Sequence, residues 1–375
     1  MYRLEIAETV EKISNVTSQR TLVNRAIQTA LERVYNFHDF PYYIQDKGCI
    51  KTTNDYSTGT VSITNGSTTV TGSGTSWTSA MVGRKIRFES QTAYYRISAV
   101  GSTISITLEQ PFQGTTDTSA TYVIFQDEYR LAPDVDKYKI IKQIENGIPL
   151  YSSPPTDFDE SNPMPTAYGD PTLEVMEGTL LDTYSTGTIT GVVNTSTLTG
   201  SGTSWTSVEG MGRMTKIKSG TSVLTVKSVD SDTQITVYET ISTSIAASST
   251  YEAIMNNLRV QVNPLPDAQK LLYYRYFRIP APLTSDYDIP DMPHSWHWLL
   301  IYGALAMVLL QKGDVTKAQE IAEARFVSGM GDMKLKLGSF TPDRIYSRRS
   351  TDRMRSLRGR LDGLEEASYD RRFSS

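Results

Sequence analysis

Two kinds of hydrophobic pattern divide the chain into segments expected to be helical and segments expected to be strands. From residue 18 to residue 34 the apolar side chains recur every three or four positions and form one stripe, which is typical of an amphipathic helix. Ile6, Val10 and Ile13 predict a shorter helix before it. Between residues 56 and 126, and again between 184 and 251, apolar residues alternate with polar ones, which predicts half-buried strands.

Near the other end, Pro293 is expected to open a helix that is apolar on nearly every face to Leu310, with an uninterrupted apolar run from Trp298. Because a membrane-spanning helix needs about 20 apolar residues, this shorter run predicts a buried helix and no membrane contact. Gly313 is expected to end it and Asp314 to cap the next helix. The apolar stripe of that second helix is Ala318, Ile321, Ala322 and Phe326.

The alternating segments contain an internal repeat. The strings YSTGT and TGSGTSWTS occur at Tyr56 and Thr71 and again 128 residues later. Over the 24 positions from Tyr56 to Ser79, 15 are identical in the second copy. We therefore expect two duplicated all-β domains, each a sandwich or a barrel: the first β-unit at residues 54–127 and the second β-unit at residues 182–256. In each, a turn packed under a tryptophan is expected, formed by Gly72, Gly74 and Trp77 and by Gly200, Gly202 and Trp205.

The segment between the β-units is acidic and rich in proline. Residues 128–181 begin as an extended segment and then carry five prolines, a density that predicts no regular element there. From Tyr151 to Asp182 there are seven carboxylates and no lysine or arginine. A solvated linker is the plainer interpretation of this patch.

Composition and motifs argue against an enzyme. A net charge of -4 leaves no overall basic field for nucleic acid. The single cysteine, Cys49, excludes an intrachain disulfide and is expected to be a small buried thiol. The glycines of TGSGTSW lack the spacing of a phosphate-binding loop, and His294 and His297 stand without a metal-binding motif. We expect no catalytic residue, no cofactor and no metal. A cell-wall hydrolase is the enzyme that remains open, and it would need two acids that converge.

Outside the β-units, six segments follow one another in a characteristic order. They are SQRTLVNRAIQTALERVYNFHDFPY; DEYRLAPDVDKYKIIKQI, which reads as a strand and a helix; MPTAYGDPTLEV; LRVQVNPLPDAQKLLYYRYFRIPAPL; DIPDMPHSWHWLLIYGALAMVLLQKGD; and TKAQEIAEARFVSGM. In pattern and order this composite resembles the head-to-tail adaptor, or connector, proteins of tailed bacteriophages, of the type that forms a ring on the portal. The resemblance implies an α+β fold. Its core is a helical bundle with small β-strands, formed by residues 1–53, 128–181 and 257–337 and interrupted by the two β-units.

The resemblance also implies a function. Adaptors are structural virion proteins that form a ring of about twelve copies beneath the portal. Such a ring extends the channel for genomic DNA, without sequence-specific binding, and offers a docking platform to tail nozzle or fibre proteins. The expected location is the neck of the virion, after assembly in the host cytoplasm, since the first residues lack the apolar stretch of a secretory signal. The alternative is a carbohydrate-binding or fibre-docking tail protein that uses the β-units and aromatics such as Tyr94 and Tyr95.

Two further sets of residues are expected to make contacts. The first, in the core or at a subunit interface, is the face of the apolar helix that carries Trp296, Trp298, Leu299, Tyr302, Leu305 and Leu309. The second is the C-terminal tail, residues 338–375, which is expected to bind the portal through Arg344, Arg348, Arg349, Arg353, Arg355, Arg358 and Arg360. Residues 338–360 hold these seven arginines and two acids, a net charge of +5. A solvated tail and a contact with packaged DNA remain open.

Overall fold

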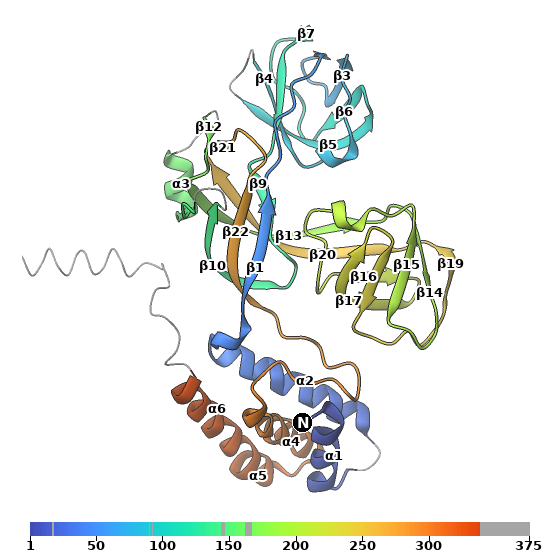
Figure 1. Ribbon diagram of the computed structural model, residues 1–375, viewed down its shortest axis with the longest axis vertical. Helices are drawn as coiled ribbons and strands as arrows, with labels where there is room; N and C mark the ends of the chain where they lie inside the picture. Colours follow the sequence, from blue (N-terminus) through green and yellow to red (C-terminus); the bar gives the residue numbers. More distant parts are fainter. Residues whose placement is uncertain (17–18, 90, 92, 144–146, 162–166, 338–375) are drawn as a thin grey trace, which may run out of the picture. The chain divides into compact units, whose positions relative to one another are not determined.

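The computed structural model describes residues 1–337, except 17–18, 90, 92, 144–146 and 162–166 (Figure 1). The helices nearest the two ends of this stretch pack together. They are α1 (Arg3–Ser14), α2 (Arg20–Phe37), α4 (Trp298–Lys312) and α6 (Ala324–Leu337), with the short α5 (Val315–Lys317) and the π-helix η5 (Ala318–Glu323) between the last two. The stripe predicted on α2 is buried as expected, because its apolar residues face α1 and α4.

The helix α4 lies among the others. It contacts α1, α2, η5 and α6, which is why it is apolar on nearly every side. Gly303 allows the close approach, since a Cβ atom there would lie 2.8 Å from both the Ala30 Cβ and the Phe326 ring. Gly313 ends the helix at a φ of 87°, as the sequence predicts.

The next helical segment differs from the expected regular stripe. Ala318, Ala322 and Phe326 are fully buried, but Ile321 is 49% exposed. The segment Ala318–Glu323 is a π-helix, whose wider turn shifts the phase of the side chains. Ile321 is thereby rotated away from the buried face.

A three-stranded antiparallel sheet follows the helices, in the order β1-β22-β10. Its strands are β1 (Ile44–Lys51), β22 (Leu271–Arg278) and β10 (Val135–Gln143). The prediction of a strand followed by a helix in DEYRLAPDVDKYKIIKQI is wrong in its second part, because Val135–Gln143 is the strand β10. Two register shifts against β22, at Val135/Lys137 and Tyr138/Ile140, lengthen the apolar spacing from two residues to three. The sequence of a bulged strand then imitates a helical stripe.

A long antiparallel ribbon leads from this region into the second β-unit. It consists of β13 (Leu173–Tyr184) and β20 (Glu252–Asn263), which pair along their whole lengths. The ribbon carries β9 (Glu128–Arg130) on the outer side of β20 and β11 (Tyr151–Ser152) at one end of β13. A separate small pair is β12 (Tyr168–Gly169) with β21 (Leu265–Pro266). The proline-rich stretch nevertheless contains a helix, α3 (Pro155–Ser161), because proline is tolerated in the first turn of a helix.

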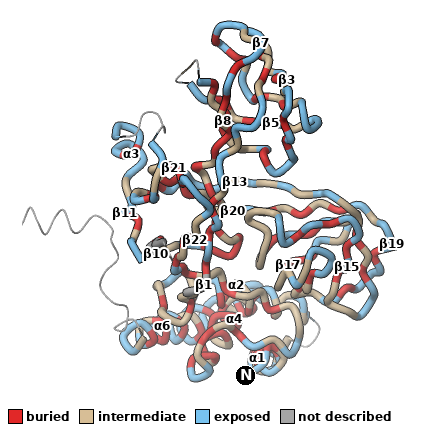
Figure 2. The backbone as a smooth tube through the Cα atoms, turned by 45° about the horizontal axis from the view of Figure 1, so that its top comes forward, coloured by how far each residue is buried: buried red, intermediate tan, exposed pale blue. Residues whose placement is uncertain are grey.

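Each β-unit has its own strands and its own apolar cluster. The first forms a sheet in the order β7-β2-β3-β6-β5-β4-β8, with the strands β2 (Thr60–Ile63), β3 (Thr69–Ser73), β4 (Lys85–Phe88), β5 (Tyr94–Ser102), β6 (Ser105–Leu108), β7 (Asp117–Ala120) and β8 (Tyr122–Phe125). The second continues from β20 in the order β16-β17-β18-β15-β14-β19, with the strands β14 (Thr188–Gly191), β15 (Thr197–Ser201), β16 (Lys216–Ser219), β17 (Ser222–Ser231), β18 (Gln234–Val237) and β19 (Ile245–Ser249). Figure 2 shows buried segments in the helices, in the central strands and in each β-unit.

The expected fold class is wrong. Among the described residues, strands account for 38% and helices for 27%, and no helical-bundle core is evident there. Residues 128–181, assigned to a helical core by the sequence, form mainly β9, β10, β11 and β13. The error follows from the bulged β10 and from the long β13–β20 ribbon, whose pairing between distant segments no local pattern reveals.

Candidate functional site

The two tryptophans under which the repeated turns are predicted to pack are fully buried, and each donates a hydrogen bond to a tyrosine. Trp77 Nε1 donates to the Tyr122 hydroxyl at 3.1 Å, and that hydroxyl donates to the Thr58 carbonyl at 2.6 Å. In the second β-unit, Trp205 Nε1 donates to Tyr251 at 2.9 Å, and Tyr251 donates to the Thr186 carbonyl at 2.9 Å.

The glycines of the repeated string make this arrangement possible. A Cβ atom on Gly72 would lie 2.2 Å from Thr75 Oγ1, and one on Gly200 would lie 2.2 Å from Thr203 Oγ1. Gly74 and Gly202 adopt φ values of 69° and 68°. The repeat therefore forms the same packing arrangement twice, with Trp77 in one apolar cluster and Trp205 in the other.

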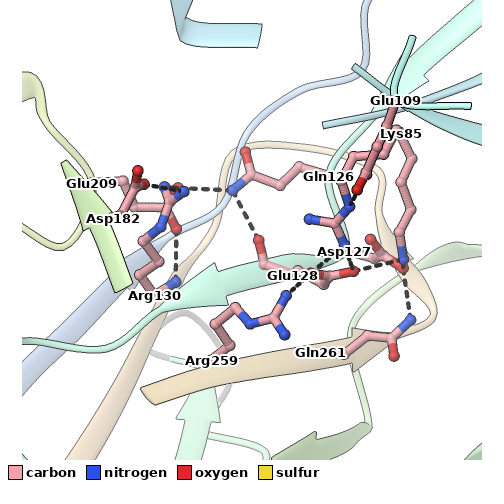
Figure 3. Close-up of polar contacts among 11 residues, drawn as sticks. Lys85, Glu109, Gln126, Asp127, Glu128, Arg130, Asp182, Glu209, Arg259 and Gln261 are labelled. Carbon is pink, nitrogen blue, oxygen red and sulfur yellow. Dashed lines mark hydrogen bonds and ion pairs between the residues drawn. The ribbon is translucent and has the colours of Figure 1, made fainter. Parts of the chain in front are cut away.

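A network of charged side chains lies where the first β-unit meets β9 and β20 (Figure 3). Lys85 Nζ lies 2.8 Å from Asp127 Oδ2 and 2.9 Å from Glu128 Oε1. Arg96 NH2 contacts Glu128 Oε1 at 2.6 Å, and Arg259 NH1 contacts Glu128 Oε2 at 2.8 Å. One carboxylate thus receives cations from β4, β5 and β20.

Burial and the cations act in opposite directions on Glu128. Burial raises the pKa of its carboxyl, but the hydrogen bond from Arg96 and the charge of Lys85 outweigh it and lower the pKa to about 2. Burial also lowers the pKa of Lys85, yet the charges of Asp127 and Glu128 raise it overall. Both groups are therefore ionised at neutral pH.

A second set of contacts joins the two β-units. Glu209, from the second β-unit, accepts hydrogen bonds from Gln126 Nε2 at 3.0 Å and from the main-chain N–H of Arg130 at 2.8 Å. The Arg130 guanidinium lies 2.6 Å from Asp182 and 3.4 Å from Glu209. Gln126 also donates to the Glu128 carbonyl, so the two sets of contacts are continuous (Figure 3).

These charged residues were absent from the sequence prediction. The signal was present in the first β-unit, whose lysine and arginines, Arg84, Lys85, Arg87 and Arg96, all fall within 13 residues of a segment otherwise rich in serine and threonine. Their partners could not be identified, because Asp127, Glu128 and Arg259 lie on other elements.

The six residues predicted on the apolar helix lie in three surroundings. Trp296 and Leu299 belong to the main helical cluster, and Leu305 and Leu309 pack against Ala318 and Ala322. Trp298 and Tyr302 instead line an open hollow together with Arg325, which donates to the Tyr302 hydroxyl at 2.7 Å. Helices of the same chain cover most of α4, so the need of α4 for apolar partners is no argument for oligomerisation.

Other predicted residues can be placed briefly. Cys49 is exposed, contrary to expectation, because β1 turns that side chain outward. Tyr95 is buried and only Tyr94 is exposed, so the two do not form an aromatic surface. The seven arginines of the tail lie outside the described residues.

In the described part of the chain, no group of three or more His, Cys, Asp or Glu side chains could hold a metal ion. No helix among the same residues is both long and apolar enough to cross a membrane.

Comparisons with known proteins point to one family. A family model described as SU10 adaptor protein matches residues 178–358, a segment that runs from β13 through the second β-unit to α4 and α6. No curated protein matches the chain. Among solved structures, Phage phi92 endosialidase aligns over 66% of this chain and 56% of that chain, with 13% identity and a TM-score of 0.15, too low to support any argument. This match covers slightly less than half of the chain and supports a phage adaptor role.

Proposed function

We propose that this chain is a structural protein of the virion neck that forms a ring of about twelve copies beneath the portal and connects the capsid to the tail. The match of residues 178–358 to the SU10 adaptor family carries this proposal. The ring extends the channel through which genomic DNA passes, without reading its sequence. Its outer surface, including the β-units, is the platform for tail nozzle or fibre proteins.

The charged network supports such a scaffold. Glu128, Lys85, Arg96 and Arg259 form short, largely buried contacts, and Glu209 connects the second β-unit to the same region. Charged side chains in this arrangement fix the geometry of neighbouring elements more than they add stability. The β-units are thereby held as rigid projections, as a docking platform requires.

The portal is the proposed partner of the basic tail. Residues 338–360 carry a net charge of +5, and arginine forms bidentate contacts with carboxylates. Such charges also steer association with an acidic surface. In this proposal the tail binds the portal, and the described residues form the ring.

Two measurements test the proposal. Electron cryomicroscopy of the virion is expected to show the chain in a ring at the neck, and its absence from the neck would exclude the adaptor role. In a pull-down with the portal, a chain that ends at Gly338 is expected to lose most binding. A chain that ends at Arg360 is the matched control, because it keeps all seven arginines. Equal binding by both shortened chains would exclude the tail as the docking segment.

A further inference from the structure

The outer edge of β13 is open over most of its length. On one side β13 pairs with β20 from Leu173 to Tyr184. On the other side β11 covers Leu173 and Glu174 only, through Tyr151 and Ser152. Beyond Glu174, no other described strand pairs with this edge.

The direction of the main-chain groups follows from β20. The carbonyl of Leu258 accepts from Leu131 N, and Val262 N donates to the Asp127 carbonyl, so even-numbered residues of β20 point away from β13. Thr179 is paired with Leu258, and Leu181 with Asn256. The N–H and C=O groups of Thr179 and Leu181 therefore point away from β20, toward the open edge.

These outward groups lack partners among the described residues. No hydrogen bond within the described chain reaches the main chain of Thr179 or Leu181 from the open side. The next outward residue, Thr183, is different, since its N–H donates to the Asp182 carboxylate at 2.9 Å. The open section is thus centred on Thr179 and Leu181.

The side chains along this open section of β13 do not block the addition of another strand. Leu181 is 68% exposed and Met176 is 47% exposed. Natural edge strands are usually blocked by lysine, proline, a bulge or a covering loop. Residues 173–184 contain neither lysine nor proline, and the register shift of β13 lies between Met176 and Gly178, before Thr179 and Leu181. An open, partly apolar edge of this kind is a site for the addition of a strand.

The acidic side chains near the edge of β13 indicate the charge of its partner. Of the seven carboxylates between Tyr151 and Asp182, Asp182 pairs with Arg130 and Asp170 with Lys270, and the others form no ion pair with a described residue. Among them are Glu177 on β13 and the acids of α3, a helix that contacts β13. A basic strand would therefore be attracted to this edge, and an acidic one repelled.

We propose that the edge of β13 at Thr179 and Leu181 binds an extended, basic segment of another virion protein, which adds to the sheet as a further strand. The partner's main chain hydrogen-bonds to Thr179 and Leu181, its apolar side chains cover Leu181 and Met176, and its lysines or arginines face Glu177. That the partner comes from the virion rests on the proposed function.

Hydrogen exchange provides the first test. The peptide that covers residues 177–183 is compared by mass spectrometry in the purified chain and in purified virions. Its open-edge amides are expected to exchange about tenfold more slowly in the virion, because a new strand protects them. Equal exchange, with the chain visible at the neck, would overturn the inference while the adaptor role stands. Absence of the chain from the neck would overturn both.

Variants identify the occupant. Thr179→Pro removes an outward N–H without removing a hydrogen bond to β20, and Leu181→Lys adds a like charge for a basic partner. Both are expected to abolish the protection and to lower the yield of infectious virions. The control is Val223→Lys, at a residue that is 55% exposed on β17 and paired with β16. Equal behaviour of Leu181→Lys and Val223→Lys would overturn the inference. So would self-association of the purified chain that Leu181→Lys abolishes, because a second copy would then be the occupant.

Discussion

Single residues in this chain act through partners that lie far away in the sequence. Glu128 is the clearest case, because its carboxylate is shared by Lys85, Arg96 and Arg259 at 2.6 to 2.9 Å. The sequence shows the cations of the first β-unit as a group, but it does not show that they converge on one acid. The central role of the Glu128 carboxylate in the candidate site could therefore not be predicted from the sequence.

Replacing this carboxylate is expected to be costly. Glu128→Gln leaves Lys85, Arg96 and Arg259 without their shared acid, and loss of one member of a largely buried ion pair costs about 3–5 kcal/mol. The measurement is the free energy of unfolding from denaturant titration at pH 7. Glu109→Gln is the control, since Glu109 is 3.7 Å from Arg96 and 56% exposed. We expect the control to lose about 1 kcal/mol or less.

Glu128 is also expected to account for part of the loss of stability at acidic pH. The pKa of Glu128 is about 2 in the folded chain, against 4.5 for an ordinary glutamate. Its contribution to stability is therefore complete above pH 4.5 and is lost as the pH falls toward 2. Thermal unfolding across this range should show a weaker pH dependence in Glu128→Gln than in the unaltered chain. An unchanged slope would contradict the assigned pKa.

The duplicated tyrosines allow a paired experiment. Tyr122→Phe and Tyr251→Phe each remove a hydroxyl that accepts from a buried tryptophan and donates to a main-chain carbonyl. Each substitution is expected to cost about 1–3 kcal/mol in the free energy of unfolding, because a buried donor loses its acceptor. Tyr94→Phe should have little effect, as Tyr94 is 40% exposed. A large loss of stability from one substitution and none from the other would show that the two β-units are not stabilised by the same hydrogen bonds.

At the scale of elements, the sequence predicted best where the periodicity was uninterrupted. The alternation at Val61 and Ile63 and at Ile235 and Val237 corresponds to β2 and β18, and the stripe of residues 18–34 corresponds to α2. It predicted worst where one residue is inserted into the regular pattern. The bulges of β10 and the π-turn of η5 both change the spacing of apolar positions, and both led to wrong expectations.

The close packing of α2, α4 and α6 depends on Gly303, and this can be tested by substitution. Gly303→Ala is expected to destabilise the chain by about 1–3 kcal/mol, because the added Cβ would lie 2.8 Å from Ala30 and Phe326. Gly331→Ala on α6 is the matched control, since nothing lies within 4 Å of its added Cβ. Alanine is the better helix former, so the control should gain about 0.5–1 kcal/mol. Equal effects in thermal unfolding would contradict the packing described for α4.

At the scale of the whole molecule, the described hydrophobic clusters of the helices, the central strands and each β-unit are separate. The cluster among the helices and the cluster among β1, β10, β20 and β22 contain no residue of 54–127 or 182–256. The proposed domain boundaries remain a prediction. If they are correct, each β-unit can be removed without opening the remaining clusters.

The ends of the first β-unit lie close enough for a direct excision. Tyr56 and Ile124 exchange two main-chain hydrogen bonds at 2.8 Å, and Thr53 contacts Gln126 at 3.2 Å. A chain without residues 56–125 is expected to unfold cooperatively in calorimetry, though less stably, because Glu128 loses Lys85 and Arg96. In this background Glu128→Gln should cost less than in the full chain, since only Arg259 remains. An equal cost in both backgrounds would contradict the coupling.

The second β-unit requires a different excision, because β13 and β20 run continuously into it. Asp182 and Met255 are paired across the ribbon, and Met255, an odd-numbered residue of β20, points toward β13. Joining them by Asn-Gly should close a two-residue hairpin, since a hydrogen-bonded pair flanks such a turn.

The excision of the second β-unit also removes Arg213, which lies 2.9 Å from the buried Asp134. We therefore expect a folded chain of lower stability, and Asp134→Asn should recover part of the loss by removing the buried, unpaired charge. Circular dichroism and thermal unfolding measure both effects, and a chain that loses its helical signal would show that the second β-unit is required by the rest of the fold.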